Sequence, residues 1–197
     1  MKEVWDKRYK SNEYMYGLKP NQYLITNLNK LKPGKILLPG DGEGRNSIYA
    51  AKLGWEVTAF DYSSSGKEKA LKLAESNNVN INYKVSDVET FDSLEKFDVI
   101  SIIFLHLPKE TRINFHKNLH KFLKPEGLVI LECFSKYQLN NTSGGPKNLD
   151  LLYSMDEIKK DFSDYNIDFI EESDTVLDEG PLHQGKANVI RLIARKP

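Results

Sequence analysis

The sequence predicts an α/β fold in which helices cover both faces of a mostly parallel sheet. Stretches typical of strands alternate with stretches typical of helices along most of the 197 residues, which is the pattern of parallel βαβ units. Residues 35–38 are apolar and lead directly into a glycine-rich turn and then a helical stretch. Residues 97–104 are apolar apart from Asp98 and Ser101, as expected of a strand that is buried on both faces.

Before residue 97, the sequence predicts three strands with two helices between them. The strands are expected at residues 35–38, 55–60 and 80–85. The first helix is expected at residues 47–53 and can end at Gly54, because glycine readily adopts the left-handed conformation that closes a helix. Ser65 and Glu68 have the spacing of a capping box, which predicts a second helix that continues to about residue 74.

After residue 104, two further helices and three strands are expected. Pro108 is suited to the first turn of a helix, whose buried face recurs at helical spacing: Phe115, Leu119, Phe122 and Leu123. A turn at 124–127 leads to a strand at 128–134, and the stretch 140–146 has loop composition. Capping-box spacing of Ser154 and Glu157 predicts a short helix that ends at residue 162. Residues 168–177 and 187–194 read as two strands of an antiparallel hairpin at the sheet edge.

Length and composition predict one domain, residues 1–197, with an N-terminal cap at 1–32 and a core at 33–197. Cys133 is the only cysteine, so the chain forms no internal disulfide. The longest apolar run is far shorter than the ~20 residues of a membrane span, and the charged N-terminus lacks the apolar core of a signal peptide. A cytoplasmic protein without a membrane partner is therefore expected.

The charge balance predicts a protein that does not bind nucleic acid. The chain has 28 Lys and Arg residues against 28 Asp and Glu residues, and its formal net charge is zero. Proteins that grip the phosphate backbone usually carry a basic surplus. A monomer or a homodimer that acts on a small molecule is expected.

The glycine-rich turn indicates a nucleotide-like cofactor. Gly40, Gly42 and Gly44 lie between a predicted strand and a predicted helix, where glycine lets the backbone turn tightly and approach a ligand. Amides at the start of the helix can meet a carboxylate or a phosphate. A dinucleotide fingerprint would place its third glycine at position 45, which is Arg45. A P-loop is excluded, because no Gly-Lys-Ser/Thr follows.

Two aspartates follow the second and third predicted strands. Asp61 stands 21 residues after Gly40, where a carboxylate can accept hydrogen bonds from a ribose diol. Asp87 can accept from the exocyclic amine of an adenine, and Val88 beside it offers a backbone amide and an apolar contact. Because the carboxyl ends of parallel strands meet at one edge, both aspartates are expected to face one crevice.

These motifs resemble the Rossmann-like (class I) methyltransferases that use S-adenosylmethionine. Residues 37–46 are similar to the first motif of that family, and their Gly-Arg-Asn ending is specific to a subgroup. Residues 97–105 and 123–131 resemble the motifs around its fourth and fifth strands. Residues 5–9, with Tyr16-Gly17 and Pro20-Asn21, resemble the cap of the tellurite-resistance and thiopurine methyltransferase-like group. The resemblance implies a seven-stranded sheet of order 3-2-1-4-5-7-6 with an antiparallel seventh strand.

The resemblance also implies the cofactor, S-adenosyl-L-methionine, with S-adenosyl-L-homocysteine as product. The first motif would surround the methionine part, through Gly40, Asp41, Gly42, Gly44, Arg45 and Asn46. Asp61 and Tyr62 would hold the ribose, Asp87 and Val88 the adenine. Phe104 and Leu105 would lie beside the methionine chain, with Arg8 at its carboxylate. The chain departs from the family at Leu38, where many members carry an acidic residue.

A small acceptor is predicted, with a thiol or a metalloid oxyanion such as tellurite or selenite favoured. The Asp/Asn-Pro-Pro-Tyr/Phe motif of enzymes that methylate DNA bases is absent after the fourth strand. By resemblance, His183 and Arg191 bind or activate an anionic acceptor. His106 follows the fourth strand, where an acceptor often approaches. The connection at 135–153 has a length typical of an active-site cover.

Two other classes of function stay open. An NAD(P)-dependent oxidoreductase is disfavoured by the GxGxG spacing and by the absence of a recognisable Tyr-x-x-x-Lys. A non-catalytic S-adenosylmethionine-binding regulatory protein is disfavoured by the long cap and loop. His116 and His120 have the spacing of a metal pair on one helix, but no third ligand has the expected spacing, so no metal site is predicted.

Overall fold

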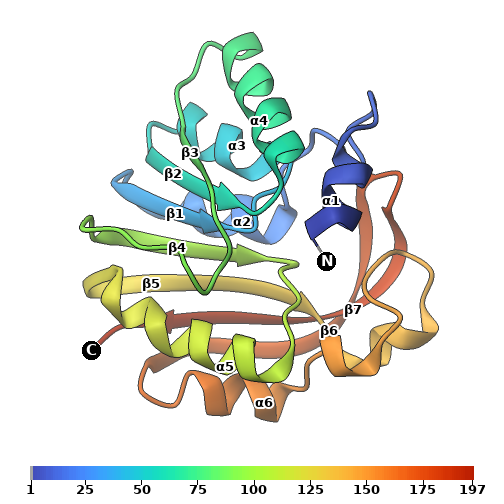
Figure 1. Ribbon diagram of the computed structural model, residues 1–197. Helices are drawn as coiled ribbons and strands as arrows, with labels where there is room; N and C mark the ends of the chain where they lie inside the picture. Colours follow the sequence, from blue (N-terminus) through green and yellow to red (C-terminus); the bar gives the residue numbers. More distant parts are fainter. Residues whose placement is uncertain (1) are drawn as a thin grey trace.

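The computed structural model describes residues 2–197, which form one seven-stranded sheet covered by helices on both faces (Figure 1). The strand order is β3-β2-β1-β4-β5-β7-β6, and only β7 runs antiparallel to its neighbours. The predicted fold class and strand order are confirmed. The strands are β1 (Lys35–Pro39), β2 (Glu56–Asp61), β3 (Asn82–Val85), β4 (Phe97–Ile103), β5 (Leu123–Phe134), β6 (Asn166–Gly180) and β7 (His183–Arg195).

The helices fall into two groups, because successive residues of a buried strand point to opposite faces of the sheet. Ile36 and Leu38 of β1 share a cluster with residues of α2, α3 and α4, whereas Leu37 belongs to the cluster that holds α5 and α6. The helices are α1 (Lys2–Tyr9), α2 (Gln22–Leu28), α3 (Arg45–Lys52), α4 (Ser64–Ser76), α5 (Lys109–Asn118) and α6 (Met155–Asp161). Within residues 2–197, no helix combines the length and the apolar character that a membrane crossing requires.

Three predicted boundaries were wrong. The helix α4 begins at Ser64, because the hydroxyl of Ser63 caps it by accepting from the Gly66 amide. The predicted turn at 124–127 belongs to β5, which passes through it with a register shift and a left-handed Glu126. The helix α5 ends at Asn118. A 3-10 turn, η1 (Leu119–Lys121), follows it and continues the apolar face with the buried Leu119.

The C-terminal hairpin is longer than predicted. The strands β6 and β7 pair over most of their length and are joined through Pro181 and Leu182. The paired strands extend beyond β5 toward α1, so the hairpin tip reaches the carboxyl ends of the parallel strands (Figure 1). The predicted capping box at Ser154 and Glu157 is confirmed and opens α6.

The N-terminal segment divides into two parts with different positions. The helix α1 lies against α4 at the carboxyl ends of the parallel strands (Figure 1). The helix α2 instead packs its buried Leu24 and Leu28 against the sheet. Only α1 and the loop after it are therefore placed to cover a site at the strand ends.

Candidate active site

The glycine loop lies where β1 ends and α3 begins. Its amides at Gly40 and Asp41 both approach the carbonyl of Phe60, which continues the pairing of β1 with β2. Gly40 and Gly42 have φ values of 64° and 60°, in the left-handed region that favours glycine. A Cβ atom at Gly42 would lie 2.7 Å from the Tyr9 hydroxyl oxygen. The loop thus needs glycine both for its turn and for the close approach of α1.

Asp61 ends β2 beside this loop and is 95% shielded from solvent. Its Oδ1 accepts from the Ser63 amide at 2.8 Å. Burial raises the pKa of Asp61 to about 6, although the Ser63 and Gly42 amides lower it. Tyr62 next to it is half-buried, and burial raises its pKa to about 12. The predicted ribose-side residues therefore adjoin the glycine loop.

The helix α1 covers the same strand ends. Asp6 accepts from the Ser63 hydroxyl at 2.6 Å, directly after the residues that end β2. Tyr9 is buried, and its ring packs near Gly42 and Gly66. Arg8 stacks over the Trp5 ring at 4.4 Å and donates to the Tyr16 hydroxyl at 2.6 Å. A ligand on the glycine loop would therefore lie beneath α1.

Asp41 is a buried carboxylate inside the loop. Both of its oxygens are shielded from solvent and form no hydrogen bond of normal geometry among residues 2–197, although Ser47 approaches them with its hydroxyl and its amide. Burial raises the pKa of Asp41 to about 7, Ser47 lowers it, and the negative charge of Asp61 raises it. Asp41 and Asp61 are therefore two neighbouring acids whose pKa values are raised by burial.

The remaining predicted cofactor residues lie on both sides of the loop. Phe104 follows β4 with a φ of 52°, and Leu105 places its side chain over Gly40. Asp87 is exposed, and its Oδ1 accepts from the Glu89 and Thr90 amides, so this carboxylate caps a turn. Val88 packs half-buried against the core near α5.

Arg45 and Asn46 make contacts that the sequence did not indicate. Arg45 is buried and donates through Nη2 to Glu179 Oε2 at 2.8 Å, and through Nη1 to the Tyr16 carbonyl. The side-chain oxygen of Asn46 accepts from the Asn21 amide at 2.9 Å. Arg45 thus binds both the N-terminal segment and the hairpin tip, and Asn46 binds the N-terminal segment.

Asn21 and Glu132 complete a buried polar cluster. The Asn21 side chain donates to Glu132 Oε2 at 2.6 Å and to Glu179 Oε1 at 2.9 Å. Glu132 Oε1 accepts from Arg191 Nε at 2.9 Å. Sequence reasoning missed this cluster, although one signal was available. Glu132 interrupts an apolar strand, and a buried charge requires partners.

His183 lies at the start of β7 among aromatic rings. It is 96% shielded, and its ring meets those of Tyr16 and Phe104 edge to face at centroid distances of 4.6 and 4.7 Å. Its Nδ1 is 3.3 Å from Glu179 Oε2. Within residues 2–197, Nε2 of His183 has no hydrogen-bond partner. The backbone of Gly144, from the predicted cover loop, lies against that edge of the ring.

Arg191 and Arg8 differ in their charge partners. Arg191 pairs with Glu132 and faces Glu171 at 3.5 Å, so its guanidinium already has two carboxylate partners. Arg8 makes no ion pair with any of residues 2–197, and its positive charge lowers the pKa of His183. The cation without a carboxylate partner beside His183 is therefore Arg8.

His106 is held at both ring nitrogens by the backbone. Its Nδ1 is 2.6 Å from the Leu151 carbonyl, and its Nε2 is 3.2 Å from the Phe134 amide. Nδ1 must therefore donate and Nε2 accept, which is the pattern of a neutral imidazole. Burial lowers the pKa of His106 to about 4. Through these contacts His106 connects the loop after β4 to the segment before α6.

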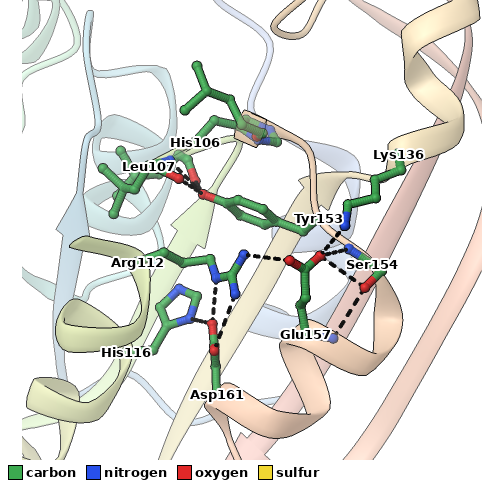
Figure 2. Close-up of polar contacts among 11 residues, drawn as sticks. His106, Leu107, Arg112, His116, Lys136, Tyr153, Ser154, Glu157 and Asp161 are labelled. Atoms are coloured by element: carbon green, nitrogen blue, oxygen red, sulfur yellow. Dashed lines mark hydrogen bonds and ion pairs between the residues drawn. The ribbon is translucent and has the colours of Figure 1, made fainter. Parts of the chain in front are cut away.

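A second buried cluster joins α5 to α6 and includes His116. Asp161 accepts from Arg112 Nε at 2.7 Å and from His116 Nδ1 at 2.8 Å (Figure 2). Tyr153, above Arg112, accepts at its hydroxyl from the Leu107 amide. Among the described residues, no group of three or more His, Cys, Asp or Glu side chains could hold a metal ion.

Comparison with known proteins shows which proteins this chain resembles. Residues 36–127 match the methyltransferase domain family. The chain is 24% identical over 164 residues to the probable S-adenosyl-L-methionine-dependent methyltransferase TehB of Haemophilus influenzae, covering 82% of this chain and 54% of that protein. It is 35% identical over 109 residues to a ubiquinone biosynthesis O-methyltransferase of Rickettsia akari, covering 55% and 42%. The chain spans about half the length of the curated relatives it matches.

Solved structures share the fold. A protein studied for the conversion of a disulfide bond into a thioacetal during echinomycin biosynthesis matches all of this chain and 91% of its own, with a TM-score of 0.83 and 18% identity. TehB of Haemophilus influenzae matches all of this chain and 67% of its own, with a TM-score of 0.74 and 22% identity.

Residues 36–127 thus match a methyltransferase domain, and the chain is similar to the probable S-adenosyl-L-methionine-dependent methyltransferase TehB, as the motifs predicted. TehB is named as a methyltransferase that depends on S-adenosyl-L-methionine, which is the cofactor that the motifs of this chain predict. The loop fits that group, because two left-handed glycines leave its surface free of Cβ atoms and a buried carboxylate stands beside it.

Proposed function

We propose that this protein transfers a methyl group from S-adenosylmethionine to a small acceptor that binds between α1 and the hairpin tip. The observation that carries the proposal is the position of His183, which lies in an aromatic enclosure next to Phe104 at the end of β4. Asp61 and Tyr62 would hold the ribose, Asp87 and Val88 the adenine, and the glycine loop the methionine part. Arg8 would bind the methionine carboxylate, because it is the cation there without a carboxylate partner.

The chain's own residues then align the acceptor and take its proton. When bound, S-adenosylmethionine would supply a methyl group on a sulfonium, so that the acceptor's lone pair could bond to the methyl carbon while the carbon–sulfur bond breaks and S-adenosylhomocysteine leaves. Orientation of the two reactants supplies roughly 7–11 kcal/mol in favourable cases. His183 Nε2 accepts the proton of the acceptor, and α1 with the Gly144 loop excludes water.

The surroundings of His183 favour an acceptor that carries a proton at neutral pH and an apolar body. Phe104, Phe134 and Tyr16 line the ring on three sides. A thiol fits this enclosure best, and a phenol is a second candidate that the O-methyltransferase relatives support. A metalloid oxyanion needs no base and is the third candidate. Arg191 is neutralised by Glu132, so His183 is the residue assigned to the acceptor.

Calorimetry and a methyl-transfer screen test the proposal together. S-adenosylhomocysteine should bind with micromolar affinity, and NAD should not bind. Binding of NAD alone would indicate an oxidoreductase. Radiolabelled methyl transfer is then screened over thiols, phenols, selenite and tellurite, with His183→Ala as the variant and His120→Ala as a matched histidine control. Cofactor binding without transfer to any acceptor would favour a regulatory protein.

A further inference from the structure

Glu179 is a buried carboxylate that three separate elements hold in place. It lies near the end of β6 and is 7% exposed. Oε2 accepts from Arg45 of α3 at 2.8 Å, and Oε1 accepts from Asn21, the N-cap of α2, at 2.9 Å. Oε2 also lies 3.3 Å from His183 Nδ1. A carboxylate held in this way cannot turn freely, so it presents a fixed acceptor to the imidazole.

The charges of the buried cluster balance only when His183 is neutral. Arg45 and Arg191 face Glu179 and Glu132, which gives two cations and two carboxylates. A protonated His183 would add an unpaired positive charge. Burial lowers the pKa of His183, as do Arg45 and Arg8, whereas Glu179 raises it.

Further groups face His183 from the elements packed around it. Tyr16 meets it from the segment after α1. His106, from the loop after β4, lies close enough for the two imidazoles to influence each other. None of these groups offers Nδ1 a better acceptor than Glu179.

A carboxylate can only accept, so Nδ1 of a neutral His183 carries the proton. Nε2 is then left with its lone pair. This nitrogen makes no hydrogen bond to residues 2–197 and faces the Gly144 loop that covers the enclosure. The tautomer set by Glu179 is the one that a proton acceptor at Nε2 requires.

We propose that Glu179 is a positioning residue that fixes His183 in its Nδ1–H tautomer and thereby keeps Nε2 free to take the acceptor's proton. The inference rests on the proposed function. Arg45 directly follows Gly44, so the loop that would hold the cofactor also anchors Glu179. The Gly-Arg-Asn sequence thus connects the cofactor side of the site to its acceptor side.

Nitrogen-15 NMR of the histidine rings in the cofactor-free protein tests the tautomer directly. The wild-type protein should show His183 as a neutral Nδ1–H imidazole at pH 7. In Glu179→Gln, the Nδ1–H form should lose its dominance and the His183 pKa should fall. Asp178→Asn is the matched control, because Asp178 is adjacent but pairs with exposed Lys19 on the surface. An Nε2–H or charged His183 in the wild-type protein would overturn the inference, whether or not an acceptor is methylated.

Kinetics with an acceptor found in the screen test the consequence. Glu179→Gln should lower kcat by roughly 10²-fold, within the range of general acid–base effects, and change the affinity for S-adenosylhomocysteine by less than about threefold. The acidic limb of the kcat/KM profile should move to lower pH, which a purely structural role would not cause. Glu179→Asp is the second variant, to be used if Glu179→Gln folds poorly. It keeps the negative charge and should retain part of the wild-type rate. An unchanged profile in folded Glu179→Gln would refute the positioning role.

Discussion

Replacing Asp41 by asparagine should make the stability of this protein depend less on pH. Both oxygens of the Asp41 carboxylate are buried and form no hydrogen bond of normal geometry among residues 2–197. Asparagine has nearly the same shape but no charge, so the substitution removes the cost of burying the ionised form. The expected effect is therefore an increase in the free energy of unfolding, relative to the wild-type protein, that grows as the pH rises above the pKa of Asp41 in the unfolded chain.

The sign and size follow from the pKa. Asp41 ionises near pH 3.8 in the unfolded chain and at about 7 in the folded protein, chiefly because it is buried. Between these values the folded state holds a proton that the unfolded state has lost, so wild-type stability falls as the pH rises through this window. At about 1.4 kcal/mol per unit, the total loss is at most about 4 kcal/mol. Asp61, with its pKa raised to about 6, contributes in the same direction.

Urea unfolding of the cofactor-free protein at several values between pH 4.5 and pH 8 measures this effect. Near pH 4.5 the variant should be more stable than the wild-type protein by only about 1 kcal/mol, since only a small part of the window lies below that pH. Between pH 4.5 and pH 8 this difference should grow by up to about 3 kcal/mol. Asp61→Asn shows how far the two acids titrate as a pair. If the difference between Asp41→Asn and the wild type is the same at both ends, the pKa of Asp41 is not raised and the reasoning fails.

Three further predictions address the cofactor site and the scaffold. Asp61→Ala should weaken S-adenosylhomocysteine binding by roughly 10- to 100-fold, because two ribose hydrogen bonds lose their acceptor; unchanged affinity by calorimetry would remove Asp61 from the ribose. Arg8→Ala should weaken S-adenosylhomocysteine by about tenfold but leave methylthioadenosine, which has no carboxylate, unaffected; an equal loss for both would place Arg8 elsewhere. Asp161→Ala should cost about 3–5 kcal/mol in urea unfolding, because Arg112 is left buried and unpaired. Exposed Asp156→Ala is its control, and equal stability of the two variants would contradict the buried pair.

The fold could be predicted because its signals are local. Apolar strands such as residues 97–104 and capping residues such as Ser154 act within a few residues of the chain, and the structure reproduces them. The errors fall where a tertiary contact competes with a local preference. Lys124 and Pro125 have turn chemistry, but β4 pairs with the chain on both sides of them and draws them into β5. The hairpin is longer than its apolar pattern because β6 and β7 support each other outside the core.

The sequence by itself indicated the resemblance to methyltransferases, because the glycine loop, its flanking elements and the acidic residue after β2 are close in the chain and follow from backbone chemistry. Only the tertiary structure decided the acceptor side. Asn21, Arg45, Glu132, Glu179 and His183 are far apart in sequence, and they meet because β7 runs back between β5 and β6 while the N-terminal segment crosses the strand ends. The strand order brings their charged groups together, and a local sequence pattern does not indicate which carboxylate will face which cation.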